Sequence, residues 1–162
     1  MPRYQLAQIN VGRIKGPIDS PVMAEFVANL ERINLLAEQS PGYVWRLQSE
    51  QGDATAIETP LGEGIIVNMS VWDDVAALSH YVYKTAHVEI MKRRKEWFER
   101  MSEAITVLWW VPHGHRPTVN EAVERLAHLR AHGPGEHAFT FQRHFPAPSD
   151  QHEQDRMAVE RL

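Results

Sequence analysis

The segment Ile65–Pro117 decides the fold, because it holds two strand patterns, a long helical pattern between them and a polar loop. It begins with Ile65-Ile66-Val67-Asn68-Met69-Ser70-Val71-Trp72, continues in a helix expected from about Asp74 to Met101, and becomes extended again from Ile105 to Val111. The loop Pro112-His113-Gly114-His115-Arg116-Pro117 follows. Alternation over the strands and three- to four-residue spacing over the helix predict a strand–helix–strand unit.

An earlier unit of the same kind precedes this segment. Tyr4–Val11 alternates like a strand, and Ser20-Pro21 has the N-cap and first-turn residues of a helix that should stop near Ser40-Pro41-Gly42. Tyr43–Gln48 predicts a second strand, and the polar Gln51–Gly64 stretch predicts a loop. The chain therefore starts with its own strand–helix–strand half.

The C-terminal part adds one more helix and strand. Thr118-Val119-Asn120-Glu121 has capping-box spacing, and the helix that it starts should end at His132-Gly133-Pro134-Gly135. Ala138–Phe145 predicts a fifth strand, and Ser149–Leu162 predicts a polar tail. We expect a single domain over residues 1–148 and a tail over 149–162.

This order predicts an α+β protein with a ferredoxin-like β-α-β-β-α-β antiparallel sheet and an extra C-terminal helix and strand. The apolar face of the first strand (Ala7, Ile9 and Val11) should pack on helices, whereas the other face should stay bare and expose Leu6 and Trp72. Two bare sheets pairing face to face would form a homodimer, a dimeric α+β barrel with a ligand cavity.

Composition excludes several classes of function. The chain has 162 residues, 43% of them apolar, and a net charge of −4, which gives no reason to expect nucleic acid or an anionic membrane as a partner. It has no cysteine, so thiolate catalysis and thiolate metal sites are excluded. No apolar run approaches the ~20 residues of a membrane span, and a cytoplasmic protein is the default expectation.

Polar side chains on the strands are the first candidate ligand contacts. Asn10 and Asn68 lie on strand faces that also carry Ser70 and Trp72. Buried amides need hydrogen-bond partners or water. They can therefore line a cavity or simply bond to one another.

His87, on the central helix, is the candidate catalytic residue. An unperturbed pKa of about 6.5 suits an imidazole for proton transfer. Three interpretations stay open: a core histidine whose ring N–H meets a carbonyl, an acid–base or ligand-contacting group, and a haem axial ligand.

The remaining candidate ligand contacts are aromatic or cationic. Adjacent tryptophans on a strand point to opposite faces, so only one of Trp109 and Trp110 can face a given cavity. Arg46 needs a partner or water because it lies in an apolar strand. Two histidines of the 113–115 loop do not suffice for zinc, so no metal site is predicted. The predicted contacts are Trp45, Arg46, Trp72, Tyr83, Trp110, His115 and Arg116, with Arg116 as an anion clamp.

Five runs of the sequence carry a family resemblance: Ala24–Leu30, Ser40–Leu47, Ala86-His87, Arg93–Phe98 and Trp109–Thr118. They resemble a bacterial family catalogued as domain-of-unknown-function family 3291, and the resemblance covers about Gln5–Pro148. More distantly, the order of elements is similar to the dimeric α+β-barrel superfamily of antibiotic-biosynthesis-type and haem-degrading monooxygenases. That resemblance implies that His87 and Asn10 match a helix histidine and a strand asparagine of haem-degrading members, whose pocket tryptophan is replaced here by His80 and Tyr81.

These features lead to one functional hypothesis and two alternatives. The first is a small-molecule-binding protein, with a cofactor-independent monooxygenase or related oxidoreductase as the activity to consider first. The second is a haem-binding protein with His87 as iron ligand. The third is a non-enzymatic binding module. No cofactor is expected under the first hypothesis, and the sequence leaves the substrate open.

Overall fold

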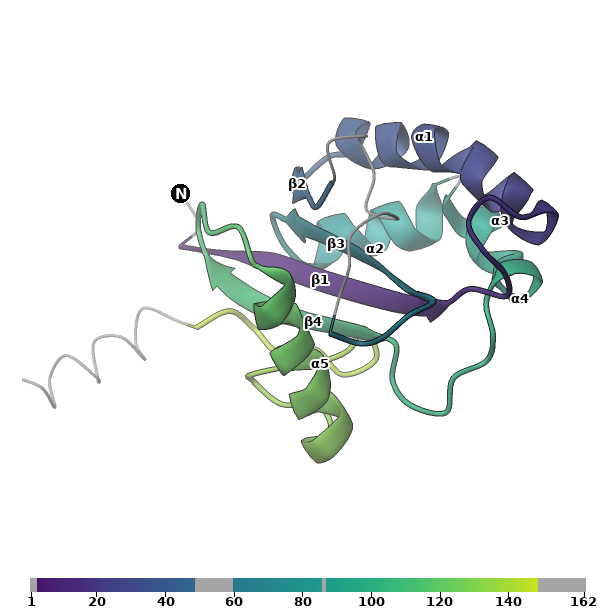
Figure 1. Cartoon of the computed structure of the whole chain (residues 1–162). Coiled ribbons are helices and arrows are strands. Elements are labelled where there is room, and N and C mark those ends of the chain that lie inside the picture. Colours follow the sequence, from purple (N-terminus) through teal and green to yellow (C-terminus); the bar gives the residue numbers. More distant parts are fainter. Residues whose placement is uncertain (1–2, 49–59, 86, 149–162) are drawn as a thin grey trace, which may run out of the picture.

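The computed structural model describes residues 3–48, 60–85 and 87–148. The expected tail 149–162 and most of the expected loop 51–64 lie outside these residues. The chain forms one sheet with helices on both sides (Figure 1). Its elements are β1 (Tyr4–Arg13), the 3-10 helix η1 (Pro21–Met23), α1 (Ala24–Gln39), β2 (Tyr43–Arg46), β3 (Ile65–Trp72), α2 (Val75–Lys84), α3 (His87–Lys92), α4 (Arg94–Trp97), β4 (Thr106–Pro112) and α5 (Val119–His132).

The sheet has the strand order β2-β3-β1-β4, and every neighbouring pair is antiparallel. β1 pairs with β3 so that Leu6 lies opposite Trp72 and Asn10 opposite Asn68. The two strand–helix–strand halves thus interleave in the ferredoxin-like order. The predicted α+β class and sheet are confirmed.

The two faces of the sheet are covered by different helices. Ala7, Ile9 and Val11 pack with Leu126 and Leu129 of α5 in one core. On the opposite face, Leu6 and Trp72 pack with Ala37 of α1 and Leu78 of α2. Figure 1 shows α5 on one side of the strands and α1 and α2 on the other.

The prediction that one face of the sheet stays bare is therefore wrong. Leu6 and Trp72 are each 0% exposed under α1 and α2, and α5 covers the face that was expected to meet those helices. Alternation defined the two faces correctly but not which helices would cover them. The homodimer stays a prediction, although the exposed apolar face that motivated it is absent from the described chain.

The central helix is broken, contrary to the single helix predicted from Asp74 to Met101. Thr85 is extended (φ −115°, ψ −177°) and ends α2. Its hydroxyl donates to the Tyr81 carbonyl oxygen at 2.5 Å and accepts from the His87 N–H at 3.2 Å. A threonine side chain can compete for backbone groups in this way. His87 consequently begins α3 instead of lying inside a long helix.

Local signals located most other boundaries. The side chain of Asp74 accepts from the Ala77 N–H at 2.8 Å and caps α2. Gly42 has φ +83° in the turn after α1, and a Cβ atom there would lie 2.4 Å from that of Ala77. Glycine is therefore required both for the backbone angle and for the close approach of the turn to α2.

The C-terminal part differs from its prediction in one respect. Thr118 caps α5 as expected, accepting from the Glu121 N–H at 3.1 Å. The expected strand Ala138–Phe145, however, is reduced to one antiparallel bridge between Phe139 and Leu108. Phe139 and Phe145 instead contact each other with ring centroids 6.0 Å apart. Among the described residues, no helix combines the length and apolar composition that a membrane span requires.

Candidate functional site

Four polar side chains form a connected strip on the face of the sheet under α1–α4. Gln8 Nε2 donates to Asn68 Oδ1 at 2.9 Å and to Ser70 Oγ at 2.8 Å. Asn10 Nδ2 donates to Gln8 Oε1 at 3.1 Å and to Asn68 Oδ1 at 3.2 Å. We call Gln8, Asn10, Asn68 and Ser70 the polar strip. Mutual bonds fix the orientation of its amide groups.

The polar strip runs from the buried core to solvent. Gln8 and Ser70 are 5% and 6% exposed, whereas Asn10 is half-buried and Asn68 is exposed. The difference follows from the short β2, which ends at Arg46 opposite Ser70 and does not run beside Asn68. The strip is therefore accessible at its Asn68 end.

An aromatic column continues from the polar strip toward α3. Trp72 Nε1–H donates to Ser70 Oγ at 2.8 Å. The ring of Tyr81 stacks on Trp72 with centroids 5.0 Å apart, and the His87 ring lies against Tyr81 at 4.8 Å. We call Trp72, Tyr81 and His87 the aromatic column. It joins His87 to Ser70 through direct contacts.

Burial keeps both titratable members of the column neutral. Desolvation lowers the pKa of His87, opposed by its hydrogen bond to the Val82 carbonyl. Because a carbonyl only accepts, the 3.4 Å contact between His87 Nδ1 and Val82 O requires the proton on Nδ1. Nε2 then carries the lone pair. Burial also raises the pKa of Tyr81, whose hydroxyl donates to Ile33 O at 3.2 Å.

Arg46 flanks the column and has the partner that the sequence required. Its Nε donates to Glu38 Oε1 at 2.9 Å, and its side chain is 10% exposed. Its charge lowers the pKa values of Tyr43 and Tyr81 against the larger effect of burial. Tyr43 meets Trp72 edge-on at 5.6 Å.

Three predicted aromatic contacts lie apart from the column. Trp45 packs against the core under α5, on the other side of the sheet. Tyr83 is 47% exposed and meets Phe141 edge-on at 5.6 Å. Trp110 shares the face of Leu6 but donates its Nε1–H to Phe145 O at 2.8 Å. Trp110 and Trp109 face opposite sides of the sheet, as predicted.

His115 and Arg116 also lie outside the column. His115 Nε2 is 2.7 Å from Glu121 Oε1, and Trp109 donates its Nε1–H to Glu121 Oε2 at 2.9 Å. This arrangement ties the 113–117 loop to the start of α5. Arg116 is exposed, and its charge slightly opposes the rise in the pKa of Tyr43.

A protein-family model matches the chain over nearly its whole length. Residues 5–156 match the model described as "Domain of unknown function (DUF3291)". The chain belongs to this family. The match includes both the polar strip and the aromatic column, and no curated protein sequence matches the chain.

Solved structures similar to this DUF3291 protein are distant in sequence. One is SnoaB, a cofactor-independent oxygenase from Streptomyces nogalater, at 16% identity and TM-score 0.40, covering 73% of this chain and 98% of SnoaB. Another is a candidate antibiotic biosynthesis monooxygenase from Nitrosomonas europaea, at 14% identity and TM-score 0.44, covering 71% and 93%. Likeness at this level carries no argument about activity.

Metal ligation finds no support in the described part of the DUF3291 chain. No three histidine, aspartate or glutamate side chains there come together in a way that could hold a metal ion. The ring nitrogens of His137 both have partners within the chain. His137 Nε2 lies 2.8 Å from Glu124 Oε1, and its Nδ1 lies 2.9 Å from Arg125 Nη1.

Sequence reasoning missed two members of the DUF3291 site as ligand-site candidates. Gln8 shares the strand face of Asn10 by simple alternation, so its place in the strip was available from the sequence. Tyr81 lies three residues after the buried Leu78, at core spacing on α2. Its position between Trp72 and His87 depends on the break at Thr85, which the pattern did not indicate.

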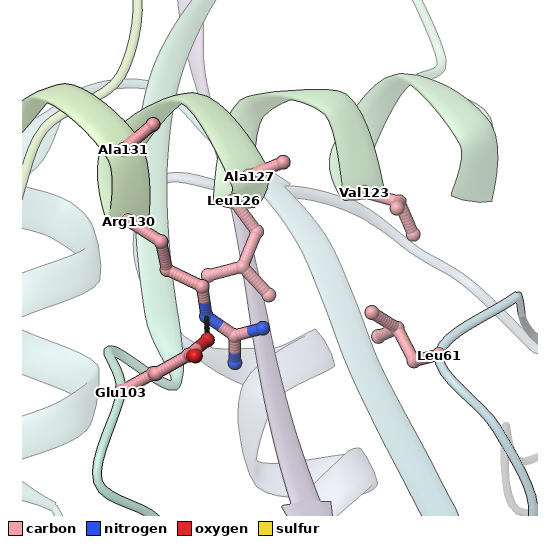
Figure 2. Close-up of a pocket in the computed structure, with 7 residues that line it drawn as sticks. All are labelled: Leu61, Glu103, Val123, Leu126, Ala127, Arg130 and Ala131. Atoms are coloured by element: carbon pink, nitrogen blue, oxygen red, sulfur yellow. Dashed lines mark ion pairs between the residues drawn. The ribbon is translucent and has the colours of Figure 1, made fainter.

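Two cavities of ligand size in the DUF3291 protein lie on the other side of the sheet. One of about 380 Å³ adjoins α5 and is lined by residues such as Leu126 and Arg130 (Figure 2). A second, of about 360 Å³, is lined by Val11 and Ile65. Leu126, Val11 and Ile65 belong to the core under α5, so these cavities are separate from the polar strip.

Proposed function

We propose that this DUF3291 protein binds a small, partly aromatic molecule at the accessible end of the polar strip, with His87 as its acid–base group. The observation that supports the proposal most is the connected set of contacts that joins His87 to Asn68. It runs through Tyr81, Trp72, Ser70 and Gln8, whose Nε2 donates to both Ser70 and Asn68. Such a set holds an imidazole and two amides in fixed relative positions, as a binding site requires.

The chemistry that this arrangement suits is proton removal from an acidic O–H or C–H group. A histidine with a lowered pKa stays neutral at pH 7, and its Nε2 lone pair can accept a proton. The amides of Asn10 and Asn68 would hold polar atoms of the ligand. An electron-rich anion formed in this way can react with dioxygen directly, so a cofactor-independent oxygenase is the enzymatic activity that we propose.

Trp72 has a supporting part in this proposal. It is 0% exposed beneath Tyr81, and its indole N–H is bonded to Ser70. It would therefore position Tyr81 and the strip, while Tyr81, His87 and the amides face the ligand. Arg46, paired with Glu38, would add a fixed positive charge beside the column.

The experiment is a thermal-shift screen of phenols and other small aromatic compounds, followed by oxygen-uptake assays on the hits. His87→Gln should abolish turnover while leaving the melting temperature within a few degrees of the parent. His80→Gln, on the exposed side of α2, is the matched control and should retain activity. If the parent and His87→Gln bind the ligand equally and neither turns it over, the result would favour the non-enzymatic binding module.

Haem is a poorer fit to these residues. An axial histidine needs an open slot for the macrocycle beside its imidazole. Here Tyr81 lies against the His87 ring at 4.8 Å and on Trp72 at 5.0 Å, so Tyr81 occupies the space between these two rings that a macrocycle would need. We expect haemin titration to give no specific band. An absorbance band at one haem per chain that disappears in His87→Ala would reverse this conclusion.

A further inference from the structure

Two adjoining cavities lie on the side of the sheet under α5. The first, of about 380 Å³, has an aliphatic lining of Leu61, Val123, Leu126, Ala127 and Ala131. The second, of about 360 Å³, is lined by Arg13, Arg100 and Ser102 beside apolar side chains that include Met101. Leu61, Glu103 and Arg130 line both cavities, which therefore adjoin at those residues.

Arg130 stands at the boundary of the two cavities. Figure 2 shows its side chain and that of Leu126 projecting from α5 toward Glu103 and Leu61. Its Nε donates to Ala104 O at 2.9 Å and lies 3.2 Å from Glu103 Oε2. Its Nη2 is buried and has no hydrogen-bond partner within the described residues. Arg130 lines both cavities, so its guanidinium group carries a positive charge at the boundary between them.

Charge in the second cavity favours an anion. Three guanidinium groups line it (Arg13, Arg100 and Arg130), against the single carboxylate of Glu103. Arg13 is 3.7 Å from Glu99, but both side chains are about half exposed (49% and 54%), so that ion pair is weak. Guanidinium groups bind carboxylates with two parallel hydrogen bonds, a geometry that lysine does not offer.

We propose that the two cavities form one binding site for a medium-chain aliphatic carboxylate. The hydrocarbon chain occupies the aliphatic cavity along α5, and the carboxylate accepts from the guanidinium groups that line the second cavity, Arg130 among them. Each cavity exceeds the ~300 Å³ at which ligand sites begin. The inference goes beyond the proposed function and does not depend on it, because the polar strip is on the opposite face of the sheet.

The test is calorimetric titration of the full chain with decanoate at pH 7, beside decan-1-ol as the uncharged equivalent. We expect one decanoate per chain, and an affinity for decan-1-ol lower by about tenfold or more, since a charge-assisted hydrogen bond is lost. Arg130→Met keeps the length of the side chain and should lower decanoate affinity to the level of the alcohol. Arg32→Met, an exposed arginine of α1, is the control and should bind decanoate like the parent.

A second variant protects the test against misfolding, because Arg130 also holds the Ala104 carbonyl. Ala127→Phe places a ring in the aliphatic cavity from an exposed position of α5 and should block both ligands without changing charge. Equal affinity for acid and alcohol, or unchanged binding in Ala127→Phe, would overturn the proposal. If decanoate dissociates a dimer, the cavities are the surface that a second copy of the chain covers, and this result would overturn the proposal too.

Discussion

The two faces of the β1–β3 pair use the same strands in opposite ways. Under α5, the facing residues of both strands are apolar, and Ile9, Met69 and Val71 are at most 1% exposed. Under α1–α4, the next residues along are Gln8, Asn68 and Ser70, joined by hydrogen bonds. One face therefore stabilises the domain by burial, whereas the other holds polar groups in fixed positions at the edge of solvent.

The largest expected effect comes from placing an amide on the apolar face. Met69→Asn leaves a cavity and an unpartnered amide under α5, so we expect a loss of about 3–5 kcal/mol in the free energy of unfolding. Asn68→Met, the adjacent residue on the exposed side, should change it by less than about 1 kcal/mol. Urea denaturation measures both. Similar losses in the two variants would mean that the faces do not differ as described.

A smaller effect should follow from breaking the polar strip at its centre. Gln8→Leu removes one donor for Asn68 and Ser70 and the acceptor for Asn10. The bonds lost are partly buried, so we expect about 1–3 kcal/mol of destabilisation by urea denaturation. A variant as stable as the parent would show that the strip does not contribute to stability.

The turn that brings α1 and β2 against α2 should be sensitive to a single methyl group. Gly42→Ala forces a side chain into a backbone angle of φ +83° and against Ala77. We expect a loss of about 1–3 kcal/mol, measured as a lowered urea midpoint. Gly62→Ala also has positive φ (+112°) but no atom within 4 Å of the added Cβ, so it should cost less.

The smallest effect concerns His87 and pH. Its pKa is lowered by burial in the folded protein. At a pH between the folded and the unfolded pKa, the unfolded chain therefore binds more protons than the folded protein does. The contribution of neutral His87 is complete above the unfolded value of about 6.5 and is lost progressively as pH falls from there toward the folded pKa. His87→Gln should flatten the loss of stability between about pH 7 and 5, and urea denaturation at several pH values measures the slope.

Much of the fold followed from local signals. Period-two alternation located β1, β3 and β4, and the caps at Asp74 and Thr118 located the starts of α2 and α5. Alternation also put Asn10, Asn68 and Trp72 on one face. These features depend on residues a few positions apart in the chain.

The rest depended on contacts that the sequence does not display. The residues around Thr85 favour a continuous helix. The side chain of Thr85 ends α2 nevertheless, because its hydrogen bonds take up backbone groups that a helix would use. The face covered by α5 was decided by the fit of Leu126 and Leu129 to the sheet, not by any repeat in the strands. Hence the polar strip could be predicted, but its cover by α1 and α2 and the aromatic column could not.

The most direct test of the central claim is an NMR titration of the labelled protein with the best phenol from the ligand screen. The side-chain amides of Asn10 and Asn68 and the imidazole of His87 report on the site. We predict concerted shifts at these three groups, with affinity lowered about tenfold or more in His87→Gln. Shifts confined to the α5 side of the sheet, or unchanged affinity in His87→Gln, would contradict a ligand site built on the polar strip and the aromatic column.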